Sequence, residues 1–165
     1  MSHKGIRSSE HIVGYNESKL AKAEVGDCVV RAIASTFELT YDVAHSWTAS
    51  NLDRKPKRGT FHTAKKLSNI FEVKNQPFDL IDKKLLTYPG SARHQKNKGT
   101  MVPITLTMFL ELFPKGRYFV LIRRHAFSIV DGVVIGNVND SKRMRAKIKF
   151  ALVVTDTPQK VRIFR

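Results

Sequence analysis

The chain has 165 residues, and its 29 Lys and Arg against 14 Asp and Glu give a net charge of +15 at pH 7. The length fits one domain over residues 1–165, and a hydrophobic content of 42% is globular and excludes a disordered chain. No apolar run approaches the length of a membrane span, we expect no signal peptide, and the single cysteine excludes an internal disulfide, which suits a reducing cytoplasm.

The first predicted helix carries that cysteine. Residues 1–24 before it are polar, and we expect them to be mobile or to lie over the core. Asp27 is a favourable N-cap, which places Cys28 at the first helical position. Val29, Ile33 and Phe37 then recur at i, i+4 and i+8. This spacing predicts a helix with one apolar face.

Threonine N-caps indicate three further helices. The first covers residues 41–50 after Thr40, and the last covers residues 106–112 after Thr105. Between them, a helix is expected after Thr60, with Phe61, Ala64 and Leu67 on its apolar face. In the first of these, Val43 and Trp47 are expected to face the core. The region 72–100 contains two prolines and a basic polar loop over 90–99, and it is not assigned an element.

Strands dominate the rest of the chain. Runs of β-branched and aromatic residues predict strands at 118–122, 125–130, 133–138, 148–155 and 161–164. Asp131-Gly132 is a hairpin signal between the second and third of these strands. Helices followed by strands predict the α+β class, with an antiparallel sheet.

Cys28 and His125 form a candidate nucleophile–base pair. A helix N-terminus and a nearby imidazolium both favour the thiolate, which is the nucleophilic form of cysteine. The alternatives are that Cys28 is a buried small hydrophobe and that His125 is a hydrogen-bonded structural residue, which are the commoner fates of a free cysteine and of a strand histidine.

The strand register decides which residue orients His125. A strict two-residue turn at Asp131-Gly132 would pair His125 with Val138 and place Asp140 on the face of the histidine. A three-residue loop, or a bulge at Gly136, would bring Asn137 to that face instead. Because glycine within a strand is a bulge signal, we favour Asn137 as the orienting residue, with Asp140 second.

The segments Asp-Cys-Val-Val-Arg-Ala, Gly-Arg-Tyr-Phe-Val and His-Ala-Phe-Ser-Ile-Val-Asp-Gly together resemble the papain-like cysteine peptidase superfamily. They are similar in particular to small phage-encoded members with a DCVVRA…GRY…HA…VDG layout, and the resemblance covers about residues 26–140. It implies a helix carrying the nucleophile, packed on a C-terminal antiparallel sheet. It also implies Cys28 as nucleophile, His125 as general base and Asn137 as orienting residue of a peptidase or amidase.

One position departs from the pattern of that superfamily. A glutamine usually precedes the cysteine by about six residues and donates to the oxyanion, whereas this chain has Lys22 there and Asn16 as its nearest upstream amide. The backbone N–H of Cys28 is then the remaining expected donor. Neither a metal-ligand spacing nor a Gly-rich phosphate loop is visible, so we expect no cofactor.

The basic residues gather in three clusters, at 54–58, 93–98 and 142–149. Such clusters favour polyanionic partners, although any single one is typical of a solvated surface. The residues expected to contact RNA or DNA are Lys55, Lys57, Arg58, Arg143 and Arg145. The sequence therefore supports two hypotheses: a papain-like cysteine hydrolase acting on a protein or peptide, and a papain-like scaffold that binds nucleic acid.

Overall fold

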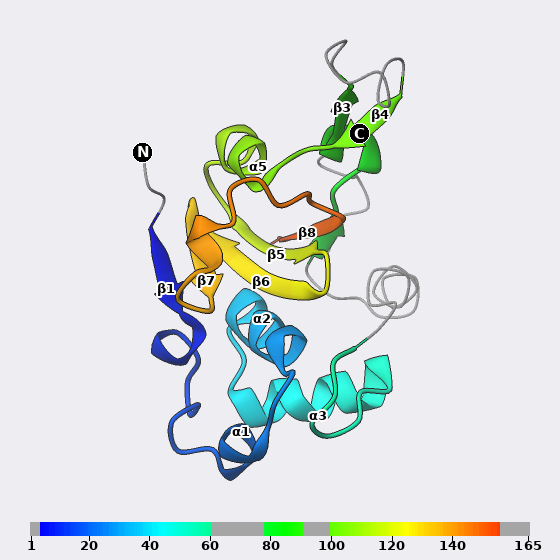
Figure 1. Cartoon of the computed structure of the whole chain (residues 1–165). Helices are drawn as coiled ribbons and strands as arrows, with labels where there is room; N and C mark the ends of the chain where they lie inside the picture. The colour runs from blue at the N-terminus through cyan, green and yellow to red at the C-terminus, as the bar shows by residue number, and fades with distance from the viewer. Residues whose placement is uncertain (1–3, 61–77, 91–99, 156–165) are drawn as a thin grey trace.

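The computed structural model describes residues 4–60, 78–90 and 100–155, and within them a six-stranded sheet forms the centre (Figure 1). The order of its strands is β1 (Gly5–Arg7), β7 (Val133–Gly136), β6 (His125–Val130), β5 (Arg117–Ile122), β8 (Phe150–Val154) and β2 (Phe78–Leu80). Every neighbouring pair is antiparallel except β1 and β7, which run parallel. The predicted α+β class is confirmed, but the sheet is mixed at this one edge.

The described residues form four α-helices: α1 (Lys19–Ala23), α2 (Cys28–Phe37), α3 (Tyr41–Leu52) and α5 (Leu106–Leu112). Figure 1 shows α2 and α3 on one side of the sheet and α5 on the other. A separate two-stranded sheet joins β3 (Thr87–Pro89) to β4 (Met101–Pro103). The helix that bears Cys28 therefore packs directly against the sheet that bears His125.

The central strands supply side chains to two cores. Phe119 of β5 is buried with residues of α2 and α3, whereas its neighbour Val120 is buried with residues of α5. Successive side chains on a strand point to opposite faces, and strands covered on both faces read as continuous apolar runs. This is why β5 and β6 were recognisable in the sequence with nearly the observed bounds.

Other predicted strands differ at their ends or were missed. The strand predicted at 133–138 ends at Gly136, and the one at 148–155 is β8, which is shorter. The strand predicted at 161–164 lies outside the described residues. The sequence did not indicate β1, β2, β3 or β4, which are only three residues long each and have too little periodicity to be recognised.

The helix starts follow the predicted caps. The hydroxyls of Thr40 and Thr105 accept hydrogen bonds from the N–H groups of Val43 and Met108, both at 3.3 Å. The expectation that Val43 faces the core is wrong, since 52% of it is exposed and the buried side of α3 is formed by Tyr41, Ala44, Thr48 and Leu52. The helix predicted after Thr60, with Phe61, Ala64 and Leu67, lies outside the described residues.

The N-terminal segment contributes elements of its own. β1 adds the edge strand beside β7, and the short 3₁₀ helix η1 (Ser8–Glu10) follows it directly. Ile12 is buried in the core on the α2 side of the sheet, and Ser18 caps α1 by accepting from the N–H of Ala21 at 3.0 Å. In the part of the chain that is described, no helix has the length and apolar character needed to cross a membrane.

Candidate active site

Cys28 is the first residue of α2, as predicted, and Asp27 precedes it. The Asp27 side chain does not cap the helix: its two oxygens accept hydrogen bonds from Tyr41 Oη at 2.8 Å and from Arg31 Nε at 3.1 Å. The carboxylate thereby ties the start of α2 to α3 and holds Arg31. The N–H groups of the first helical turn, that of Cys28 among them, have no acceptor within the helix.

A buried carboxylate braces the segment that leads to Cys28. Glu24 accepts hydrogen bonds from His45 Nε2 at 2.8 Å, from Arg54 Nη2 at 2.7 Å and from the N–H of Lys57 at 2.9 Å. Burial raises the pKa of Glu24, but the hydrogen bonds from Arg54, His45 and Lys57 outweigh it and lower the pKa to about 2. The anion therefore persists near neutral pH and fixes the loop after α3 against the segment between α1 and α2.

Two tight turns place His125. Arg123 and Arg124 connect β5 to β6, with Ile122 paired to His125 across the turn. At the other end of β6, Asp131 and Gly132 have φ angles of 46° and 79°, and Val130 pairs with Val133. Positive φ at both central residues is the mark of a type I′ hairpin turn. The strict two-residue turn is therefore the one that forms.

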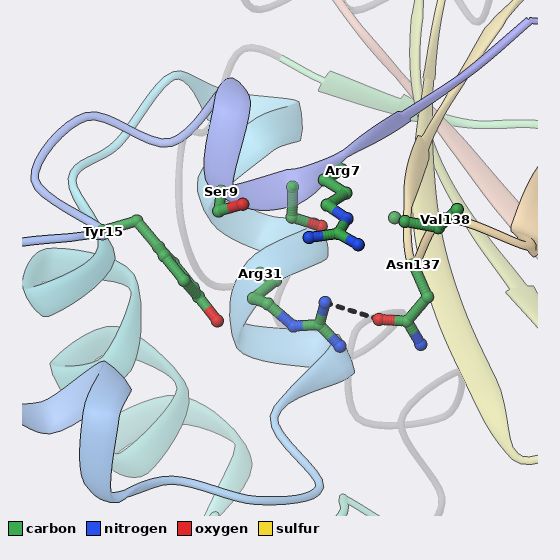
Figure 2. A pocket seen from close by; sticks show the side chains of 8 residues that line it. Arg7, Ser9, Tyr15, Arg31, Asn137 and Val138 are labelled. Atoms are coloured by element: carbon green, nitrogen blue, oxygen red, sulfur yellow. Dashed lines mark hydrogen bonds between the residues drawn. The ribbon is translucent and has the colours of Figure 1, made fainter.

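His125 is oriented by Asp140. The Nε2–H of His125 donates to Oδ2 of Asp140 at 2.8 Å, and the backbone N–H of Asn137 donates to the same oxygen at 2.6 Å. The side chain of Asn137 lies elsewhere, with its Oδ1 accepting from Arg31 Nη1 at 2.7 Å (Figure 2). Our preference for Asn137 was wrong in this respect, and the second candidate occupies the place.

The reason for this difference lies at Gly136. β7 ends at this glycine, and the chain turns back so that the N–H of Asp140 donates to the carbonyl of Asn137 at 3.0 Å and starts the 3₁₀ helix η4 (Asp140–Lys142). A Cβ at Gly136 would overlap Oδ2 of Asp140. The glycine is thus required for close approach of a carboxylate and not for a bulge.

Asp140 is fully buried and has two cationic neighbours. One is His125, and the other is Arg143, whose Nε lies 3.1 Å from Oδ1 of Asp140 while 47% of the Arg143 side chain stays exposed. A buried carboxylate is costly unless it is paired and hydrogen-bonded. Arg143, expected at a nucleic-acid surface, therefore also supports the site.

The thiol of Cys28 is acidified. Burial raises its pKa, but the hydrogen bond with His125, the N–H of Ala126 and the positive charges of His125 and Arg31 outweigh burial, so the pKa of Cys28 is lowered. Because Nε2 of His125 is engaged with Asp140, Nδ1 is the ring nitrogen left to face the sulfur. The sequence did not identify Ala126, since any residue at that position supplies the same N–H.

The imidazole is made more basic by the same contacts. Burial lowers the pKa of His125, but the hydrogen bonds to Asp140 and Cys28 and their negative charges raise it to about 9. Near neutral pH, a lowered thiol pKa and a raised imidazole pKa stabilise thiolate and imidazolium together. The two groups titrate as a pair, since each charge favours the other.

The remaining expected residues are spread over the surface. Lys22 and Asn16 are both exposed, as ordinary surface residues are. All the residues expected to contact nucleic acid are exposed, namely Lys55, Lys57, Arg58, Arg143 and Arg145, although Arg143 is also ion-paired with Asp140. Arg54, in the same cluster, is buried against Glu24, and the basic loop at 93–98 lies outside the described residues.

Two exposed cations next to the site were missed. Arg123 and Arg124 form the turn directly before His125, and a basic dipeptide between two strands was the available signal.

Among the described residues, no group of three or more side chains is placed to hold a metal ion. In comparisons with known proteins, no protein family, no curated protein and no solved structure matches the chain.

Proposed function

We propose that the protein is a cysteine hydrolase of the papain-like kind, similar to small phage-encoded members, that cleaves an amide or ester through Cys28. The observation that supports this most is the chain of contacts from Cys28 to His125 to Asp140, with the thiol pKa lowered and the imidazole pKa raised to about 9. A thiolate, an imidazolium and a buried carboxylate that fixes the imidazole are the groups such a reaction needs. A free thiolate also fits a reducing compartment such as the cytoplasm.

In the first half of this reaction, the Cys28 sulfur attacks the acyl carbon, and the electron pair of the carbonyl moves to its oxygen. In this proposal the N–H of Cys28, at the start of α2, donates to that oxyanion. His125 then gives its proton to the leaving nitrogen or oxygen as the bond to the acyl carbon breaks, which leaves a thioester on Cys28 and a neutral imidazole.

In the second half, water attacks the thioester while His125 takes one of its protons. The carbon–sulfur bond breaks, the acid product leaves, and the thiolate and imidazolium are restored. Asp140 acts through His125 in both halves, because its hydrogen bond keeps Nδ1 turned toward the sulfur and stabilises the imidazolium.

An activated ester tests this proposal without knowledge of the substrate. We expect p-nitrophenyl acetate to release p-nitrophenolate in a stoichiometric burst, with the acetyl group mapped to Cys28 by mass spectrometry, followed by slower hydrolysis. Cys28→Ala should lose the burst and keep only the slow background from lysines. Acetylation confined to lysines in the wild-type protein would contradict a nucleophilic Cys28.

The exposed cations favour a second candidate function, in which the same fold binds RNA or DNA. Gly26, just before Cys28, lies against the backbone of Gly59, so the basic loop holding Lys55, Lys57 and Arg58 sits beside the start of α2. Arg145 belongs to the second exposed cluster. A polyanion bound to the first cluster would lie beside the start of α2.

The salt dependence of binding tests this candidate. Reversing Lys55, Lys57 and Arg58 to Glu should weaken binding and flatten the plot of log affinity against log salt by roughly 0.7 to 0.9 for each phosphate that the variant no longer neutralises. Arg145→Glu is a cleaner second variant than Arg143→Glu, which would also disturb Asp140. Fluorescence anisotropy with single-stranded and duplex oligonucleotides gives the slopes.

Cys28→Ala serves as the control in that experiment, because the thiol contributes no positive charge and the slope should not change. Weak sequence preference is expected, since no base-reading motif is visible. If no oligonucleotide binds at physiological salt, the nucleic-acid candidate is rejected.

A further inference from the structure

A polar pocket of about 340 Å³ lies near the Cys28–His125 pair, although neither residue of the pair lines it. Its wall is formed by the end of β1, η1, the first turn of α2 and the segment that follows β7. Figure 2 shows Arg7, Ser9, Tyr15, Arg31 and Asn137 around it. These residues lie far apart in the sequence, so the pocket exists only because β1 pairs in parallel with β7 and brings the N-terminal segment to the site.

Two residues of the pocket wall link it indirectly to the pair. Arg31 lies one helical turn after Cys28, and its positive charge contributes to the lowered pKa of the thiol. On the other wall, the backbone N–H of Asn137 donates to the Asp140 oxygen that also accepts from His125. A ligand group in the pocket would therefore lie beside residues that are one contact removed from Cys28 and His125.

The charge of the pocket is positive. Two guanidinium groups, those of Arg7 and Arg31, line it, and no acidic side chain does so among the described residues. Asp27 is bonded to Nε of Arg31 from outside the lining and offsets one of the two charges. The balance is about one positive charge, which matches one carboxylate better than a doubly charged phosphate.

The hydrogen-bonding groups are suited to the same ligand. Arg31 uses Nε for Asp27 and Nη1 for Asn137, so these two bonds hold its guanidinium plane in place while Nη2 is left to the pocket. Tyr15 is held by an edge-on ring contact with Tyr41, at 5.2 Å between centroids. A guanidinium that is held in place in this way can donate its remaining N–H groups to a carboxylate.

We propose that this pocket binds the carboxylate of an acidic residue that flanks the scissile bond, between the guanidinium groups of Arg7 and Arg31. This inference rests on the proposed hydrolase function and narrows its substrate to acidic peptides. It gives the N-terminal segment a role in specificity, with Arg7 as a residue that selects substrate without contacting the reacting atoms.

The test uses alkylating reagents, because these report on the pocket without requiring turnover. The matched pair is the iodoacetyl derivative of glutamate α-amide and that of glutamine α-amide, which differ only in the side-chain charge. For the full chain, the second-order rate of Cys28 alkylation should be on the order of tenfold higher with the glutamate reagent. Arg7→Gln should bring the ratio of the two rates close to one.

Lys84→Gln is the matched control, since it removes one positive charge at an exposed position in the short 3₁₀ helix η2 (Lys83–Leu86), outside the pocket lining. An equal loss of preference in Lys84→Gln would show a general electrostatic effect and overturn the assignment of this pocket as the carboxylate site. If an iodoacetyl-phosphoserine reagent alkylates Cys28 faster than the glutamate reagent does, the assignment of a carboxylate as the ligand is overturned. Arg7→Lys keeps the positive charge at the end of β1, so it should retain part of the preference for the glutamate reagent.

Failure of this inference is distinguishable from failure of the proposed function. If Cys28 reacts rapidly with the glutamine reagent but shows no preference for glutamate, the hydrolase proposal survives and the pocket assignment is rejected. If p-nitrophenyl acetate leaves no acetyl group on Cys28, the hydrolase proposal fails whatever the ratio of alkylation rates is.

Discussion

Replacing Asp140 with Asn is expected to lower the pKa of His125 from about 9 toward the 6.5 of an ordinary histidine. The carboxylate raises that pKa through a 2.8 Å hydrogen bond and through its charge, and an amide keeps the shape but supplies no charge. NMR titration of the His125 ring protons measures the shift. Because the imidazolium would then be lost at lower pH, turnover of an ester at mildly alkaline pH should fall on the order of a hundredfold.

Asn137→Ala is the matched control for this prediction. The alanine keeps the backbone N–H that donates to Asp140 and removes only the side chain that contacts Arg31. The pKa of His125 should therefore stay close to its wild-type value. If Asn137→Ala lowers that pKa and Asp140→Asn does not, the orienting role assigned to Asp140 is wrong.

The second large effect is expected for His125→Ala, measured as the rate of Cys28 alkylation by iodoacetamide at about pH 6. The hydrogen bond from His125 does most to lower the thiol pKa against burial, and its charge acts in the same direction, so removing the imidazole should raise the thiol pKa. The alkylation rate should fall by roughly tenfold to a hundredfold because the thiolate fraction is smaller. The greater nucleophilicity of a more basic thiolate partly offsets this loss.

His11→Ala controls for the loss of a histidine, because His11 is exposed at the end of η1. Its alkylation rate should match that of the wild-type protein. An unchanged rate in His125→Ala would mean that the thiol reacts independently of the imidazole.

The parts of the site that could be predicted from the sequence are those set by local patterns. Cys28 at a helix start follows from Asp27 and the apolar stripe after it, and His125 in a strand follows from the flanking β-branched run. The hairpin at Asp131-Gly132 was likewise readable, although the strict two-residue turn that sets the register of β6 and β7 was the second choice. Each of these features depends on residues within a few positions of one another.

The parts that could not be predicted depend on tertiary contacts. Gly136 has the local pattern of a bulge, because nothing near it in the sequence shows that a carboxylate fills the space above it. Asp140 reaches His125 through a turn after β7, and no strand register describes that path. The parallel pairing of β1 with β7 joins segments more than a hundred residues apart, and the pocket between Arg7 and Arg31 exists only through it.

The most direct measurement of the central claim is the pH profile of Cys28 alkylation by iodoacetamide in the wild-type protein. A thiolate–imidazolium pair predicts a rate that rises at a lower pH than for an ordinary cysteine and changes again near pH 9, where the imidazolium loses its proton. A single rise centred at about 8.5, the pKa of an ordinary cysteine, would contradict the pair and leave Cys28 as a structural residue.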